Sequence, residues 1–263
     1  MSATPPSSSA YTYVYCIVQS EPFENGAPPF RAVPVGGKGN TLYTIHFMDL
    51  AAVVSDSPVA RYDIARENTM AHQLVIEEAM TRSAVLPVRF GTVASNPQAV
   101  QEKLLKRKFG EFHQLMLYVG DREELGLKVF WSRDRLFAEI AAEDGRIRAL
   151  RDNIAGRSPD ETHYQRIQLG QLTEEAIIRK RDAEAEAILE AVRPLAVQTR
   201  VNKILTDIMI LNAAFLVERA HEKEFDATVN ALDEAQAGRS IFKYAGPLPP
   251  YNFVNIVVHW QED

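Results

Sequence analysis

The sequence has a single cysteine in 263 residues, so it cannot form an internal disulfide. Cys16 lies in a run of aromatic and β-branched residues that is typical of a strand. A buried structural thiol is therefore expected there, because a nucleophilic thiol would need a nearby histidine or lysine. The fold must therefore be stabilised without disulfides.

Long apolar runs and a secretion signal are also missing. The longest apolar run, residues 208–217, is interrupted by an asparagine and is much shorter than the roughly 20 residues needed to cross a bilayer. Residues 1–10 are rich in Ser and Pro and lack a positively charged segment followed by an apolar one. They predict a disordered tail and not a signal peptide. We therefore expect a cytoplasmic protein with no lipid membrane partner.

Motifs for phosphate or metal chemistry are incomplete. The Gly-rich residues 36–41 fail as a phosphate loop, because Ala32 stands where the first glycine is needed and Gly39 where a Ser or Thr is needed. His221 begins a sequence like that of a zinc protease helix, but Phe225 replaces the second histidine. The sequence thus predicts no catalytic residue, no cofactor-binding residue and no metal ligand.

The first half of the chain has no excess of either charge, whereas the second half is acidic. Residues 1–122 are balanced, whereas residues 123–263 carry the whole formal net charge of −6. A nucleic-acid-binding protein presents a basic face, so this distribution argues against nucleic acid as a partner. With 46% hydrophobic and 24% charged residues, the chain has enough apolar material for two cores.

Residues 11–122 are expected to form a small mixed α+β domain. Pro87 within a strand indicates an edge position or a bulge, and Asn96 before a proline indicates a helix N-cap. A Pro/Gly-rich linker covers residues 21–40. The predicted elements are strands at 11–18, 42–47, 50–55 and 85–90, the second and third forming a hairpin, and helices at 68–82 and 97–120.

Residues 123–246 predict the element order βαββαβ, which is that of the ferredoxin-like sandwich, here modified by a long helical insertion. The third strand should be central, and it is the most apolar one. Gly170 is a candidate break in the long helix. The predicted elements are strands at 125–131, 195–201 (half-buried), 206–217 and 241–244, one or two short helices within 134–156, and helices at 159–193 and around 225–238.

Residues 247–263 are expected to form a C-terminal extension that packs on the domains. It contains a further alternating, strand-like run at residues 252–260. Its Pro-Pro-Tyr sequence places Tyr251 and Phe253 at a docking edge or at a contact that locks the two domains together.

The third strand of the second domain is apolar on both faces, although one face of such a sheet is usually wet. Its second face should therefore be covered by the first domain, by the C-terminal strand region or by a partner protein. Arg89 lies between two apolar strand residues, so we expect a paired arginine that fastens the strand to a helix through Glu77 or Glu78, with an anion anchor as the alternative. The candidate docking or inter-domain residues are Arg89, Ile208, Ile210, Phe215, Tyr251 and Phe253.

Several segments in this order resemble the gas vesicle protein F/L family (GvpF/GvpL). They are residues 13–18, 50–55, 85–92, 127–131 and 246–256. The resemblance implies a gas vesicle accessory or structural protein that is needed for assembly. It would bind the hydrophobic shell protein and other gas vesicle accessory proteins, and it would be associated with gas vesicles. The residues alone leave two alternatives open, a small-molecule enzyme with a site between the domains and a regulatory binding module.

Overall fold

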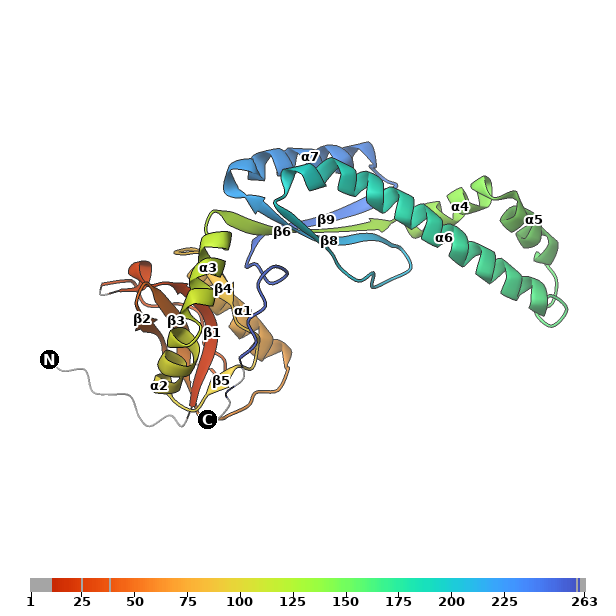
Figure 1. Cartoon of the computed structure of the whole chain (residues 1–263). Helices are drawn as coiled ribbons and strands as arrows, with labels where there is room; N and C mark the ends of the chain where they lie inside the picture. Colours follow the sequence, from red (N-terminus) through yellow and green to blue (C-terminus); the bar gives the residue numbers. More distant parts are fainter. Residues whose placement is uncertain (1–10, 25, 38, 259, 261–263) are drawn as a thin grey trace. The chain divides into compact units, whose positions relative to one another are not determined.

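The computed structural model describes residues 11–24, 26–37, 39–258 and 260 (Figure 1). The chain divides into two compact units. Unit 1 is Met1–Glu124 with Pro247–Asp263, and unit 2 is Leu125–Gly246. Each unit combines an antiparallel sheet with helices, so the expected α+β class is confirmed. The predicted disordered tail, residues 1–10, lies outside the described residues.

Unit 1 is built on a sheet with the order β2-β3-β1-β4, in which β5 also pairs with β1. Strand β1 is buried over nearly its whole length, and an irregularity between Val14 and Cys16 shifts its register with β3. This shift places Tyr13, Tyr15 and Cys16 in one core cluster, whereas Val14 is in another. The strands are β1 (Tyr11–Gln19), β2 (Leu42–Phe47), β3 (Leu50–Ser57), β4 (Val85–Pro87) and β5 (Val93–Ala94).

Helices cover both faces of this sheet. Helix α1 (Arg66–Met80) contributes to the cluster around Tyr13, and the helical region from α2 to α3 contributes to the other cluster. The predicted single helix at 97–120 is divided into α2 (Pro97–Ala99), the π-helix η2 (Val100–Lys106) and α3 (Phe109–Val119). Because π-helical hydrogen bonds link residues five apart, Val100 and Leu105 can both turn toward the core, where both are buried.

Three local predictions for unit 1 are confirmed: the hairpin, the edge position of Pro87 and the N-cap at Asn96. Strands β2 and β3 form the predicted hairpin, in which Met48 takes a positive φ of 54°. Pro87 belongs to β4, at the end of the strand order, where its missing N–H is tolerated. The side chain of Asn96 accepts a hydrogen bond from the backbone N–H of Ala99 at 2.8 Å, as an N-cap should.

Unit 2 has a four-stranded sheet with the order β7-β8-β6-β9. The third strand, β8, is central as predicted, and eight of its ten residues are buried, while Asn212 and Glu218 are half-buried. Helices α6 and α7 lie over the same face of the sheet (Figure 1). The elements are β6 (Arg122–Trp131), α4 (Arg133–Glu143), α5 (Gly145–Ile154), α6 (His163–Val192), β7 (Gln198–Val201), β8 (Met209–Glu218), α7 (Glu222–Ala235) and β9 (Ser240–Leu248).

The structure corrects four predictions about unit 2 and the C-terminal segment. Helix α6 begins at His163 and not at Pro159, and it continues through Gly170, which does not break it. Strand β7 has four residues and is mostly exposed. It is shorter than predicted because a 3-10 turn takes up the residues that precede it. Residues 252–260 form no strand in their described part, where one isolated bridge joins Val88 to Ile256.

A network of charged side chains fastens the C-terminal half of α6 to its unit. The indole N–H of Trp131 donates to Glu184 at 2.7 Å, and Arg239 pairs with both Glu184 and Glu139. Lys180 contacts Glu139 at 3.1 Å and Glu143 at 2.7 Å. These partners lie on β6, α4, α6 and the chain just before β9, so the network joins four parts of unit 2.

We expect Gly170→Ala to stabilise the protein by about 0.5–1 kcal/mol, since alanine is the better residue in a helix interior. A Cβ atom at this position meets no atom within 4 Å, so the gain is not lost to a clash. Denaturant unfolding of both proteins measures it. The matched control is Gly91→Ala, which also has open space but a φ of +83°, and which should destabilise. A loss of stability in Gly170→Ala would contradict the prediction.

Candidate binding surfaces

Unit 1 contains a cavity of about 300 Å³ between helix α1, the end of β4 and the segment that follows β9. Two of the residues selected from the sequence, Arg89 and Tyr251, line this cavity. His72 of α1 lines it as well and was not selected, because an isolated histidine on an otherwise ordinary helix carries no sequence signal. The cavity therefore combines an apolar wall with a few polar groups, the usual composition of a small binding site.

His72 is held in a fixed protonation state by its neighbours. Its Nε2 lies 3.2 Å from the carbonyl oxygen of Val88, which can only accept, so this nitrogen carries the proton. Its Nδ1 then accepts from the Tyr13 hydroxyl at 3.1 Å, and that hydroxyl accepts from the backbone N–H of Gly91. Burial lowers the pKa of His72 to about 4, so the ring is neutral at pH 7.

Within the described residues Arg89 does not form the pairing predicted for it, and its alternative role as an anion anchor stays a prediction. Its side chain is exposed, and no ion pair of Arg89 occurs within the described part of the chain. The two expected partners are engaged elsewhere, since Glu78 pairs with Arg82 at 3.1 Å and Glu77 accepts from Gln73. The prediction failed because β4 ends at Pro87, so Arg89 lies beyond the strand where burial was expected.

The segment after β9 is fastened to unit 1 by one buried carboxylate. Asn252 donates to Glu124 twice, from its backbone N–H at 2.8 Å and from its side-chain amide at 2.6 Å. Burial raises the pKa of Glu124, and these two hydrogen bonds oppose that rise. Phe253 is half-buried and Tyr251 is 42% exposed. Tyr251 is thus accessible at the cavity, whereas Phe253 is partly covered.

The candidate residues from the third strand of unit 2 lie mainly in its core. Phe215 is fully buried and packs on Phe225 with the ring centroids 5.1 Å apart, and Ile210 is 1% exposed. Ile208, just before β8, is half-buried and packs against the same cluster. Neither Ile210 nor Phe215 presents a surface to a partner protein in this conformation.

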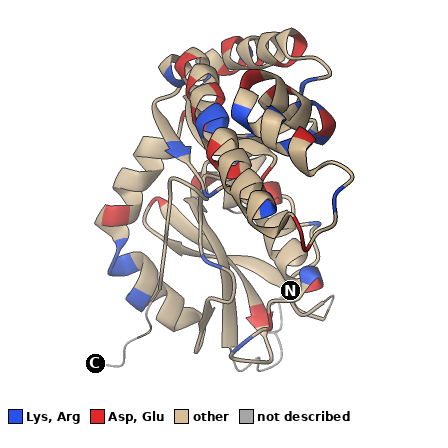
Figure 2. Ribbon diagram, turned by 90° about the vertical axis from the view of Figure 1, so that its right-hand side faces the viewer, with Lys and Arg blue, Asp and Glu red and all other residues tan. Residues whose placement is uncertain are grey.

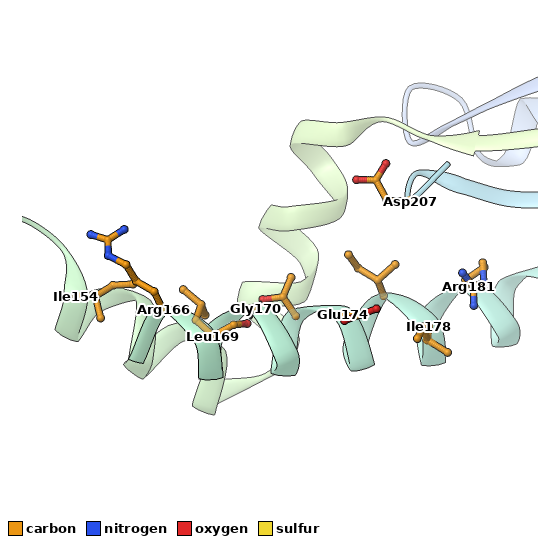
Figure 3. Close-up of a pocket in the computed structure, with 10 residues that line it drawn as sticks. Ile154, Arg166, Leu169, Gly170, Glu174, Ile178, Arg181 and Asp207 are labelled. Carbon is orange, nitrogen blue, oxygen red and sulfur yellow. Dashed lines mark hydrogen bonds between the residues drawn. The ribbon is translucent and has the colours of Figure 1, made fainter. Parts of the chain in front are cut away.

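Unit 2 carries a larger hollow of about 590 Å³ on the N-terminal part of α6 (Figure 3). One stripe of α6 forms most of its wall, with Ile154 of α5 at one end and Asp207 of the loop before β8 opposite. The stripe has an arginine near each end, and between them it is apolar or small except for Glu174. Its residues are Arg166, Leu169, Gly170, Thr173, Glu174, Ile177, Ile178 and Arg181.

The spacing of this stripe is three and four residues along the helix, which places all its members on one side. Acidic and basic residues follow one another along the same helix, a pattern typical of a solvated surface (Figure 2). Ile178 is nevertheless 40% exposed. The sequence signal for this stripe was the spacing of apolar residues by three and four positions around Gly170. It was missed because charged residues surround them.

No cluster of three or more His, Cys, Asp or Glu residues able to hold a metal ion occurs among the described residues. Cys16 is fully buried, and burial raises the pKa of its thiol, which disfavours the reactive thiolate. No helix in the described part of the chain has the length and apolar character of a membrane span. Both surfaces are suited to binding.

Comparison with known proteins places the chain in the class of gas vesicle proteins. A gas vesicle protein F from a Streptomyces species is 30% identical over 250 residues, covering 92% of this chain and 99% of the relative. One from Dolichospermum flosaquae is 27% identical over 204 residues, covering 77% and 82%. Gas vesicle protein L of the Streptomyces species is 26% identical, covering 93% and 92%.

Residues 11–255 match the family described as gas vesicle synthesis protein GvpL/GvpF, and the chain belongs to that family. The fold agrees with solved structures. The crystal structure of GvpF from an Anabaena species has a TM-score of 0.78 at 25% identity, covering 95% of this chain and 100% of that one. GvpF from Microcystis aeruginosa has a TM-score of 0.71 at 22% identity, covering 93% and 98%. The resemblance noted from the sequence is confirmed.

We expect acid to destabilise the protein through His72. Its pKa is about 4 when folded and about 6.5 when unfolded, so between these values the unfolded chain binds more protons. Stability is therefore lost as the pH falls from about 6.5 through about 4, by about 3 kcal/mol in total. Denaturant unfolding at several pH values measures this, and His72→Gln should show a shallower slope. An equal slope in both proteins would contradict the assignment.

Asn252→Asp should destabilise unit 1 by about 2 kcal/mol or more, since it removes a donor from a buried carboxylate and adds a like charge beside it. The control is Asn255→Asp, a charge-matched change at an exposed position of the same segment, expected to stay within about 0.5 kcal/mol. Thermal unfolding compares the two. Equal melting temperatures would show that the contact with Glu124 does not hold this segment.

Proposed function

We propose that this protein is an accessory protein of gas vesicle assembly that binds the hydrophobic shell protein and other assembly proteins. Membership of the gas vesicle synthesis family supports the process, and the hollow on α6 supports binding as the activity. We further propose that the protein acts in the cytoplasm in association with gas vesicles. No observation favours the alternative of a small-molecule enzyme.

The observation that carries the proposal is the hollow along α6, in whose wall Ile178 is 40% exposed while Leu169 and Ile177 are only half-buried. Of the thirty residues of this helix only Ala176, Ile188, Leu189 and Val192 are buried. Exposed apolar surface on a folded protein commonly marks a site of protein contact. A hydrophobic shell subunit needs such a contact before it joins the shell, because its own apolar surface would otherwise aggregate.

The shape of the hollow favours a helical segment as its occupant. Gly170 and Thr173 are the smallest members of the stripe, and larger apolar residues flank them. Small residues allow two backbones to approach closely, and an amphipathic helix lies in a groove through anchors at the same spacing of three and four residues. Arg166 and Arg181 near the ends would then contact acidic groups of the bound segment.

The two units also have proposed roles. The strand order β7-β8-β6-β9, with helices between the strands, supports a modified ferredoxin-like sandwich whose helical insertion is the region from α4 to α6. We propose that residues 123–246 are this domain and that residues 11–122 form the second domain. In this arrangement the insertion carries the binding stripe, and the sandwich serves as its support.

The experiment is co-purification of the shell protein with the full chain and with three variants. Ile178→Glu and Gly170→Glu place a charge within the stripe and should lower the recovered shell protein at least tenfold. Both positions are exposed, so the fold should tolerate the change. The matched control is Ile167→Glu, which alters the same residue type on the same helix at 48% exposure but outside the stripe.

Undiminished binding by Ile178→Glu and Gly170→Glu would remove the stripe from the proposal. Failure of the wild-type chain to retain the shell protein under mild conditions would remove the shell protein as a partner. Equal losses in all three variants would point to a general effect of charge on α6 and would also contradict the assigned site.

A further inference from the structure

The cavity of unit 1 offers charge of one sign to whatever enters it. Arg89 is the only charged group among the described residues that line it, because burial lowers the pKa of His72 to about 4 and leaves that ring neutral at pH 7. The other polar residues of its wall are uncharged: Thr69, Gln73, Tyr251 and Asn255. An occupant therefore gains from carrying a negative charge beside Arg89.

The guanidinium group of Arg89 has no acceptor of its own within the described part of the chain, although its backbone is fixed on both sides. The backbone N–H of Arg89 donates to the carbonyl oxygen of Ile256 at 3.4 Å. Its carbonyl oxygen accepts from the hydroxyl of Thr92 at 2.7 Å. A fixed backbone with a free planar group of N–H donors suits a carboxylate, which accepts two parallel hydrogen bonds from one arginine.

The rest of the wall is apolar and preformed. Val88, Val254 and Ile256 line the cavity, and each is at most 3% exposed. The isolated bridge between Val88 and Ile256 holds two of them side by side. Phe90 adds an aromatic ring, which packs edge-on against His72 with the centroids 5.6 Å apart. An apolar group can therefore leave water for this cavity with little ordering of the protein around it.

Size and the number of donors argue against larger or more highly charged ligands. A volume of about 300 Å³ lies at the lower end of the range of roughly 300–1,000 Å³ for small-molecule sites. A phosphate group is usually held by several backbone N–H groups or basic side chains, whereas this wall has one arginine. Both ring nitrogens of His72 are already hydrogen-bonded, so neither is free for a ligand. The cavity fits one carboxylate with an apolar group the size of an amino-acid side chain.

We propose that this cavity binds a carboxylate joined to an apolar group, with Arg89 pairing with the carboxylate and the buried valines and isoleucine receiving the apolar group. Tyr251, which lines the cavity and is 42% exposed, packs on the bound group from its solvent side. Two sources share this chemistry, the C-terminal residue of a partner polypeptide and a free small acid. The cavity belongs to unit 1 and uses no residue of α6, so this site is additional to the proposed function.

An NMR titration of the full chain with N-acetylphenylalanine, which joins one carboxylate to one aromatic group, tests the site. The wild-type protein should bind this acid, and Arg89→Met should weaken the binding at least tenfold, because methionine keeps an apolar stem and removes the charge. The matched control is Arg107→Met, which removes the same charge at another exposed position of unit 1 outside the cavity and should leave the affinity unchanged. The uncharged amide of the same compound should bind the wild-type protein at least tenfold more weakly than the acid.

A wild-type chain that does not bind the acid at millimolar concentration overturns the proposal. Equal affinities for the acid and its amide, or equal losses in Arg89→Met and Arg107→Met, overturn it as well. The α6 variants Ile178→Glu and Gly170→Glu should bind the acid as the wild type does. The proposed function is tested through those variants, so either inference can fail without the other.

A short peptide that ends in phenylalanine distinguishes the two sources of the carboxylate. If the peptide binds at least as tightly as the acid and its C-terminally amidated form binds at least tenfold more weakly, the cavity receives the end of a polypeptide. If the free acid binds and the peptide does not, the opening excludes a chain and the ligand is a small acid. Equal binding of the peptide and its amidated form, unaffected by Arg89→Met, would contradict a carboxylate site.

Discussion

Helix α6 is longer than the sheet on which it packs, and this mismatch shapes unit 2. A helix of 30 residues extends about 45 Å, whereas a strand of ten residues such as β8 extends about 33 Å. Only part of such a helix can be covered by the sheet. Its buried residues accordingly concentrate toward the C-terminal end, and the ion-pair network at Lys180 and Glu184 fastens that end to the rest of the unit. The other end packs on α5, and one side of it forms the wall of the hollow.

This division explains why charge and apolar character occur on the same helix. The charged groups near Lys180 are engaged within the unit, with the pKa of Glu139 held below its usual range by the hydrogen bond from Arg239. The stripe around Gly170 includes Ile178, which is 40% exposed. An anchored end fixes the position of the free end, so a partner meets a preformed groove and less ordering is needed on binding.

Much of the architecture follows from local signals in the sequence. Pro87 at an edge, Asn96 as a cap and the apolar third strand of unit 2 were each predictable, because backbone chemistry or burial dictates the residue at those places. The division of the helix after Asn96 and the exposure of Arg89 were not. Both depend on which distant residues are available to pack or pair, which a local pattern does not record.

The binding surfaces were the least predictable part. The hollow on α6 depends on Ile154 and Asp207 coming close to a stripe from which they are distant in sequence. The candidates in β8 were selected for being apolar on both faces, and Phe215 and Ile210 prove to be core residues. Apolar character distinguishes buried from solvated positions, whereas a site is an exposed apolar surface, and exposure emerges only from the tertiary arrangement.

The connectivity of unit 1 has a consequence for how the protein is made. Val254 and Ile256 complete one of its core clusters, yet they follow unit 2 in the chain. During translation the ribosome therefore adds every residue of unit 2 before unit 1 can close. The nascent N-terminal half therefore stays with an incomplete core until residues 254–256 are made, whereas the inserted unit is already free to fold.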